Sequence, residues 1–259
     1  HPRANERREE NISMIPLDLA LAMIVLAGLV IQTMTGFGFN VVAVTLGALL
    51  LPIKIWLPVV VALNLPMSAW VAWRNRDAID WTLLLRQILP VMAVGFAVGV
   101  AAAFVLSGNW LRTSFGVLVV LLALRELLRL SGGVQAASGA VPQSRPARLW
   151  VLLAGLVQGL YASGGPLLVH ALARMEIPRA RFRATLMTIW FTLNLVLSIA
   201  YLSGGFWTVD MGLRAAWLVL LVPPGIWLGD WLHHHASERG FAVAVQLVLL
   251  AAGLALAFG

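Results

Sequence analysis

The stretch 28-GLVIQTMTGFGFNVVAVTLGALLLP-52 contains a glycine-rich turn, Gly36-Phe37-Gly38, between two apolar runs. The run after the turn, at about residues 39–51, would form a helix of roughly 20 Å at 1.5 Å per residue. A helix must be about 30 Å long to cross the hydrocarbon core of a bilayer. The turn is therefore expected within the membrane, where irregular backbone has to face protein or a water-filled cavity.

A second stretch, 154-AGLVQGLYASGGPLLVHAL-172, repeats this arrangement. Its turn, Ser163-Gly164-Gly165-Pro166, separates short apolar runs at about 149–162 and 167–177. Proline suits the first turn of a helix, because its missing N–H is not needed there. The sequence thus predicts two breaks inside the membrane, each followed by a short helix whose N-terminus points toward the middle of the bilayer.

The composition indicates a lipid environment. Apolar residues make up 61% of the 259 residues and charged residues only 11%, whereas soluble domains carry about 25% charged residues. The net charge is +7, but the arginines lie between apolar runs, as they do in the cytoplasmic loops of membrane proteins. We therefore expect the lipid bilayer as a partner, and no nucleic acid. The chain has no cysteine, which excludes disulfides and thiolate chemistry.

The two halves of the chain repeat at a constant offset of 126 positions, which carries Gln32 to Gln158 and Pro52 to Pro178. We predict an all-α fold: a polytopic membrane helical bundle of two inverted repeats, each with a helix pair broken at a glycine-rich turn. The predicted parts are a polar N-terminal tail (1–15), a first transmembrane repeat (16–130), a cytoplasmic linker (131–147) and a second transmembrane repeat (148–259).

The distribution of arginine sets the expected orientation. If the chain reverses at both turns, most arginines outside the N-terminal tail fall on one side of the membrane. If the turns are only kinks in continuous helices, the arginines divide almost evenly between the two sides. Because Lys and Arg gather on the cytoplasmic side, the reversals are favoured, and both termini are predicted to be periplasmic.

Several tryptophans fall near the ends of the apolar runs, among them Trp56, Trp73 and Trp231. We interpret these as an aromatic belt at the membrane surface. Trp190 falls nearer the interior of a run. It is interpreted as core packing, with the lining of a cavity as the alternative.

The helix N-termini after the two turns are the predicted binding site. Their unpaired N–H groups and the positive end of the helix dipole attract anions, and broken helices in inverted repeats hold substrate in this way. The alternative is close helix packing at glycine, with amides and hydroxyls that only tie helices together. The predicted substrate-binding residues are Gln32, Thr35, Gly36, Phe37, Gly38, Asn40, Asn64, Ser68, Gln158, Tyr161, Ser163, Gly164, Gly165, Thr185 and Asn194.

His170 is an ionisable residue inside an apolar run. Imidazole changes charge near neutral pH, and an ionisable group within the membrane suggests a function, so His170 is the candidate for proton coupling. A packed, hydrogen-bonded histidine is the alternative. His233-His234-His235 is expected in an interfacial loop rather than at a metal. We predict no metal, no cofactor and no nucleophile–base pair, and therefore no enzyme.

These motifs resemble the TauE/SafE family of sulfite and organosulfonate exporters, also called the toluenesulfonate uptake permease family. The resemblance rests on the two quoted stretches and on 73-WRNRDAIDW-81 and 183-RATLMTIWFTLNLVLS-198. It implies secondary active transport, as an exporter, of a small anion such as sulfite or an organic sulfonate or carboxylate. It also implies a multi-pass protein of the bacterial inner membrane.

The expected function is therefore anion transport by alternating access, with the site between the two turns. The alternatives are an anion channel, or a membrane scaffold or enzyme subunit that transports nothing. The sequence leaves open the identity of the anion, the direction of transport and the coupling ion, which is a proton or sodium. It also leaves the oligomeric state open, with a homodimer among the options.

Overall fold

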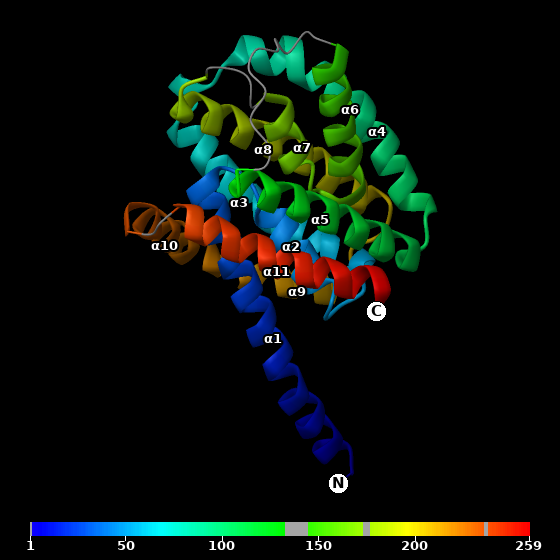
Figure 1. Ribbon diagram of the computed structural model, residues 1–259. Helices are drawn as coiled ribbons and strands as arrows, with labels where there is room; N and C mark the ends of the chain where they lie inside the picture. Colours follow the sequence, from blue (N-terminus) through cyan, green and yellow to red (C-terminus); the bar gives the residue numbers. More distant parts are fainter. Residues whose placement is uncertain (1, 133–144, 173–176, 236–237) are drawn as a thin grey trace.

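The computed structural model describes residues 2–132, 145–172, 177–235 and 238–259, and the regular structure in these ranges is helical (Figure 1). Two short 3-10 turns, η1 (Arg76–Ala78) and η3 (Val219–Leu221), and a π-helical segment, η2 (Leu83–Ile88), join longer helices. The α-helices are α1 (Pro2–Thr35), α2 (Phe39–Gly47), α3 (Ile53–Arg74), α4 (Leu89–Val105), α5 (Gly108–Leu130), α6 (Arg145–Tyr161), α7 (Gly165–Leu172), α8 (Arg179–Ser203), α9 (Val209–Leu218), α10 (Val222–His235) and α11 (Glu238–Phe258).

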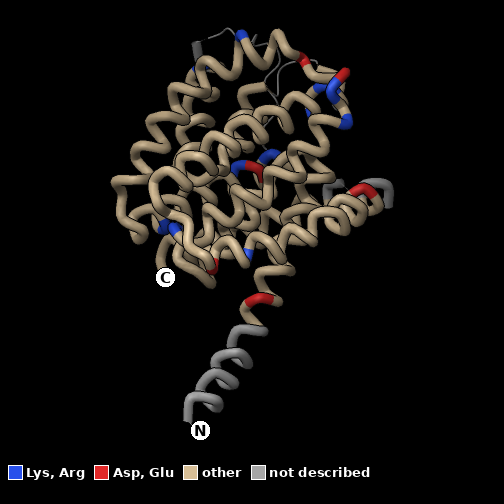
Figure 2. The backbone as a smooth tube through the Cα atoms, turned by 180° about the vertical axis from the view of Figure 1, so that it is seen from behind, with Lys and Arg blue, Asp and Glu red and all other residues tan. Residues whose placement is uncertain are grey.

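Within these ranges, 6 helical stretches are long and apolar enough to cross a membrane. Large apolar side chains such as Leu19, Val98 and Leu254 are exposed on them, as expected where the solvent is lipid. Lys, Arg, Asp and Glu gather at helix ends and connections, and most of the helical tube carries no charge (Figure 2). The predicted all-α, polytopic membrane bundle is confirmed.

Both predicted helix breaks are present. α1 ends at Thr35 and α2 begins at Phe39, with Gly36 at φ +86° and Gly38 at φ +109° between them. These left-handed conformations are open to glycine at little steric cost, and they let the chain reverse. α6 ends at Tyr161 and α7 begins at Gly165. The short helices α2 and α7 have lengths of roughly 12–14 Å, so neither crosses the membrane.

Three predictions about loops and chain ends have different outcomes in the structure. The predicted linker falls mostly in residues 133–144, outside the described residues, and α6 already begins at Arg145. The N-terminal tail predicted over residues 1–15 is continuous in secondary structure with α1, which begins at Pro2. The loop predicted at His233–His235 is wrong, because α10 extends to His235.

Glycines set the contact between α4 and α6, which lie side by side (Figure 1). A Cβ atom added to Gly95 or Gly99 of α4 would lie 2.0 or 2.2 Å from a carbonyl oxygen of α6. A Cβ atom added to Gly155 or Gly159 of α6 would lie 2.1 or 2.3 Å from a carbonyl oxygen of α4. Each helix thus carries a GxxxG pair that lets the two backbones touch, as in other tightly packed membrane helices.

The contact between α1 and α10 also depends on glycines, but here only α10 supplies them. A Cβ atom added to Gly225 of α10 would lie 2.7 Å from Cβ of Leu29 in α1. A Cβ atom added to Gly229 would lie 2.6 Å from Cβ of Thr33. Two further helix pairs with extensive long-range contact are α5 with α11 and α3 with α8. Each of these four pairs joins a helix from before the predicted linker to one from after it.

Replacing Gly155 by alanine is expected to destabilise the protein by about 1–3 kcal/mol, because the new methyl group has to displace the backbone of α4 at Met92. The matched control is Gly212→Ala in α9, where an added Cβ meets nothing within 4 Å. That change should be neutral or stabilising, since alanine is favoured over glycine in a helix. Thermal unfolding in detergent measures both, and equal unfolding temperatures for the two variants would contradict the prediction.

The tryptophans divide into two groups. Trp73 and Trp231 are 61% and 49% exposed, which fits the predicted belt. Trp56 is fully buried, and its indole N–H donates to the carbonyl oxygen of Ala43 at 2.7 Å. Placing Trp56 in the belt is wrong, because the bare backbone of Gly47 leaves room for its ring between α2 and α3.

Candidate functional site

Gln32 caps the first helix break with its side chain. Its carbonyl oxygen Oε1 accepts a hydrogen bond of 3.3 Å from the backbone N–H of Phe39, the first residue of α2. The same oxygen accepts a bond of 3.2 Å from Nδ2 of Asn64 in α3. The glutamine in the last turns of α1 therefore ties the start of α2 to the middle of α3.

Asn40 connects the first break to the second. Its Oδ1 accepts a bond of 2.9 Å from Nδ2 of Asn64. Its own Nδ2 donates to the carbonyl oxygen of Ala162 at 2.6 Å. Ala162 lies between α6 and α7 and has a positive φ of 53°, a conformation uncommon for a residue other than glycine. The amides of Gln32, Asn40 and Asn64 thus form one chain of hydrogen bonds that ends on the other break.

The second break has a glutamine cap of the same kind. Oε1 of Gln158 accepts a bond of 3.0 Å from the backbone N–H of Gly164. Nε2 of Gln158 donates to Oδ1 of Asn194 in α8 at 2.9 Å. Ser163 turns back on its own loop, where its hydroxyl donates to the carbonyl oxygen of Tyr161 at 2.9 Å. In each break, a glutamine links the N-terminus of a short helix to an asparagine of a long one.

The two breaks also touch through Phe37 and Trp190. A Cβ atom added to Gly165 would lie 3.4 Å from Cβ of Phe37 and 3.7 Å from the Trp190 ring. The indole N–H of Trp190 donates to the carbonyl oxygen of Gly36 at 3.4 Å. Side chains from the two halves therefore close over each other where the helices are interrupted.

The amide cluster (Gln32, Asn40, Asn64, Gln158 and Asn194) is buried. Gln32, Asn64 and Gln158 are 1–2% exposed and Asn194 is fully buried. In the described part of the chain, Oδ1 of Asn64 and Nδ2 of Asn194 have no hydrogen-bond partner. A buried amide atom without a partner costs about 1–3 kcal/mol. The cluster therefore has unused hydrogen-bonding capacity that a small polar ligand could satisfy.

The helix N-termini are partly occupied, which revises the expectation that their N–H groups are all free. The first helical hydrogen bond of α2 runs from Val42 to Gly38, and that of α7 from Leu168 to Gly164. The glutamine caps take one further N–H in each break. The N–H groups of Asn40, Val41, Gly165 and Leu167 take part in none of these bonds.

Four predicted site residues have their polar atoms engaged elsewhere. The hydroxyl of Ser68 donates to the carbonyl oxygen of Asn64 in its own helix. The hydroxyl of Thr185 accepts from the backbone N–H of Asp80, before α4. Thr35 is exposed and bonds to its own turn. Tyr161 shares a hydrogen bond of 2.7 Å with Ser114 of α5, so its hydroxyl faces α5 rather than the cluster.

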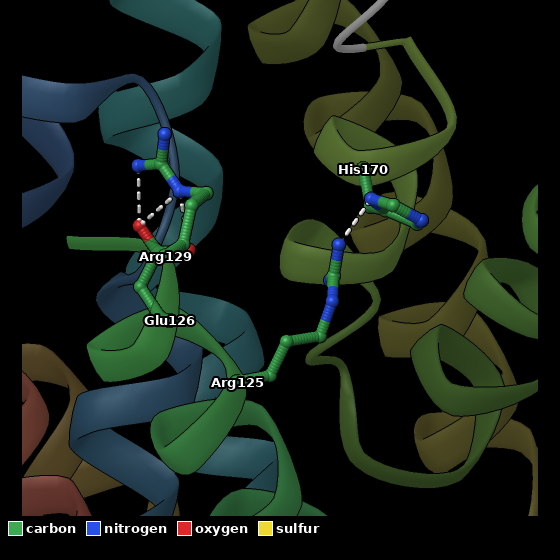
Figure 3. Close-up of polar contacts among 4 residues, drawn as sticks. All are labelled: Arg125, Glu126, Arg129 and His170. Carbon is green, nitrogen blue, oxygen red and sulfur yellow. Dashed lines mark hydrogen bonds and ion pairs between the residues drawn. The ribbon is translucent and has the colours of Figure 1, made fainter. Parts of the chain in front are cut away.

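His170 of α7 points toward Arg125 of α5, and the two side chains form a hydrogen bond (Figure 3). Because a guanidinium group only donates, Nδ1 of His170 is the acceptor in this bond. The imidazole also packs edge-on against the ring of Trp150, with 4.8 Å between the two ring centroids. Beside it, Glu126 and Arg129 form a separate ion pair along α5. These contacts place His170 at the α5–α7 contact, and none of them reaches the amide cluster.

Three residues at the site were not among the predicted ones: Arg183, Met187 and Trp190. Arg183 covers Gly36, and Sδ of Met187 accepts from Nε2 of Gln32 at 3.8 Å. With Asn194, they repeat along α8 at the i, i+4, i+7, i+11 spacing of one helix face. That spacing is visible in the sequence and is the signal that could have found them.

A small cavity lies near the C-terminal end of α8, at the other end of this helix from Arg183. Its volume is about 20 Å³, room for a single water molecule. Lys54 and Leu57 of α3, Leu160 of α6 and Tyr201 of α8 are among its lining residues. Leu160 lies in the last turn of α6, just before the second break, and the walls of the cavity are mostly apolar.

Comparison with known proteins gives a consistent result. The profile of the family described as "Sulfite exporter TauE/SafE" matches residues 20–256. The "Probable inner membrane transporter protein TsaS" of Comamonas testosteroni is 26% identical over 199 residues, which cover 76% of this chain and 80% of that protein. No solved structure matches the chain. The protein is thus a membrane transporter with several helices long enough to cross a bilayer, and not an enzyme. It belongs to the sulfite exporter TauE/SafE family.

Proposed function

We propose that this protein is a secondary transporter that exports a small anion, such as sulfite or an organic sulfonate or carboxylate, by alternating access. The anion binds between the two helix breaks, close to Asn64, Asn194 and the free N–H groups of α2 and α7. The family's description and the relative's name support the class of protein. The site geometry supports the location.

The observation that carries the proposal is the buried amide cluster joining both breaks. Backbone N–H groups at helix N-termini and side-chain amides suit an oxyanion, because they supply donors without adding a full charge. Since the cluster is buried and the breaks touch each other, an anion reaches it only after the halves separate on one side. This favours alternating access over a channel with a continuous path.

The pattern of helix contacts supports the inverted repeat. Leu29 and Thr33 of α1 stand 126 positions before Gly155 and Gly159 of α6. Leu29 and Thr33 pack against Gly225 and Gly229 of α10, and Gly155 and Gly159 pack against the backbone of α4. In the proposed repeat, α3 corresponds to α8 and α5 corresponds to α11. The contacts α3–α8 and α5–α11 therefore each join a helix to its own equivalent in the other half. With the positive-inside rule, this arrangement supports a periplasmic location for both termini.

The test is uptake of labelled sulfite, methanesulfonate and acetate into proteoliposomes, with a proton or a sodium gradient imposed separately. We expect saturable transport of at least one anion, acceleration by one of the two gradients, and exchange with anion on the other side. Transport that does not saturate and shows no exchange would indicate a channel. Absence of transport for every anion would favour the scaffold alternative.

A further inference from the structure

Arg183 lies on the first helix break. A Cβ atom added to Gly36 would lie 3.4 Å from Cγ of Arg183 and 3.9 Å from its Cα. The arginine side chain therefore runs directly over the bare backbone of the turn. Its Nε is buried and has no hydrogen-bond partner in the described part of the chain, while the side chain as a whole is 35% exposed. The guanidinium group thus spans the boundary between water and the turn.

The counter-ion of Arg183 holds it weakly. Nη2 of Arg183 lies 3.9 Å from Oδ1 of Asp230 in α10, beyond hydrogen-bond distance, and the Asp230 side chain is 59% exposed. An exposed ion pair of this kind contributes little to stability. A sulfonate or carboxylate can accept two parallel N–H bonds from a guanidinium group, so such an anion competes well with Asp230 for Arg183.

The face of α8 below Arg183 leads to the amide cluster. Met187 contacts Gln32, Trp190 donates to Gly36, and Asn194 accepts from Gln158. At 1.5 Å per residue, Asn194 lies roughly 16 Å from Arg183 along the helix axis, which is about half the thickness of the hydrocarbon core. One face of a single helix therefore connects a cation at the mouth with the unpaired Nδ2 of Asn194.

We propose that Arg183 captures the anion at the mouth of the first break, on the side of the arginine-rich loops, and that Asp230 competes with the anion for the guanidinium group. This inference rests on the proposed transport function. The mouth on the other side carries no arginine at the equivalent position, since the residue 126 positions before Arg183 is Leu57, which lines the mostly apolar cavity beside Lys54. Capture by arginine is therefore a property of one side of the membrane.

The test compares Arg183→Gln with Asp230→Asn in inside-out and right-side-out membrane vesicles, with sulfite and methanesulfonate as probes. Arg183→Gln should raise KM by roughly ten- to hundredfold on the arginine-rich side, the effect of losing a charge-assisted hydrogen bond. Asp230→Asn should lower KM by about two- to fivefold on that side, because it removes the competitor. In both variants, KM on the other side should stay within about twofold of wild type.

Arg181 supplies the matched control. It lies on the same turn of α8 and has the same loose geometry, with Nη1 3.9 Å from Oδ2 of Asp80. Arg181→Gln should leave KM within about twofold of wild type. If Arg183→Gln behaves like Arg181→Gln, or if Asp230→Asn raises KM as Arg183→Gln does, the pair is only a structural ion pair and the inference is wrong.

If the proposed transport function is wrong, the wild-type protein will transport neither anion. The same variants are then compared by the shift in thermal unfolding that methanesulfonate produces in detergent. A shift for Arg183→Gln equal to that of wild type overturns the inference. A shift that is lost in Arg183→Gln and enlarged in Asp230→Asn supports it.

Discussion

Replacement of Gly164 by leucine is expected to abolish anion transport. A Cβ atom at Gly164 would lie 2.2 Å from the carbonyl oxygen of Ala154 and 3.0 Å from Cβ of Gln158. The start of α7 would have to move away from α6, which breaks the cap from Gln158 to the Gly164 N–H. A displacement of about 1 Å at a binding site can lower activity a hundredfold, and leucine forces more than that. Uptake into proteoliposomes measures the loss.

The control for this variant is Gly212→Leu in α9, where the new Cβ has open space. It should retain transport. Gly38→Leu should resemble Gly164→Leu, because φ is +109° at Gly38 and a side chain is strained there. Size-exclusion chromatography separates a folded but inactive protein from an unfolded one. Wild-type rates in both Gly38→Leu and Gly164→Leu would rule out the junction of the breaks as the site.

Replacement of Gln158 by glutamate is expected to lower transport by a hundredfold or more. Glutamate keeps an oxygen that can accept from the Gly164 N–H, but it loses the Nε2 donor to Asn194 and adds a negative charge. The repulsion between unit charges about 4 Å apart is roughly 4 kcal/mol at an effective dielectric constant of 20. An anion at the junction would be excluded, and the initial uptake rate measures this.

Two further variants separate charge from hydrogen bonding. Gln158→Met removes both hydrogen bonds without adding charge, and its loss of transport should be clearly smaller than that of Gln158→Glu. Gln87→Glu adds the same charge in η2, outside the amide cluster, and should transport at a rate close to wild type. Equal losses in Gln158→Met and Gln158→Glu would mean that no anion binds beside this side chain.

The helix breaks could be predicted from the sequence because the physical constraint is simple. A run such as 39–51 is too short to cross the bilayer, and glycines at 36 and 38 permit a reversal. The predicted short helices are present, although α2 ends earlier, at Gly47. The junction of the breaks, which the structure shows through Asn40 and Ala162, followed from placing both turns at the same depth.

The orientation of individual side chains could not be predicted in the same way. Ser68, Tyr161 and Thr185 are as polar and as central in sequence as Asn64, yet they bond to their own helix, to α5 and to the loop before α4. Which face of a helix meets the site depends on its rotation, and packing sets that rotation. The glutamine caps were missed for a related reason: a side chain at Gln32 reaches the start of α2 only once the turn has folded.

The crossed pairing of helices has a consequence for how the protein is made in the cell. α1 packs against α10, and α4 packs against α6 through bare glycine backbone. While the ribosome is still synthesising the second half, α1 is in the bilayer without its partner, and its interrupted end has nothing to close against. The native pocket can therefore assemble only late in membrane insertion, once nearly the whole polypeptide has emerged.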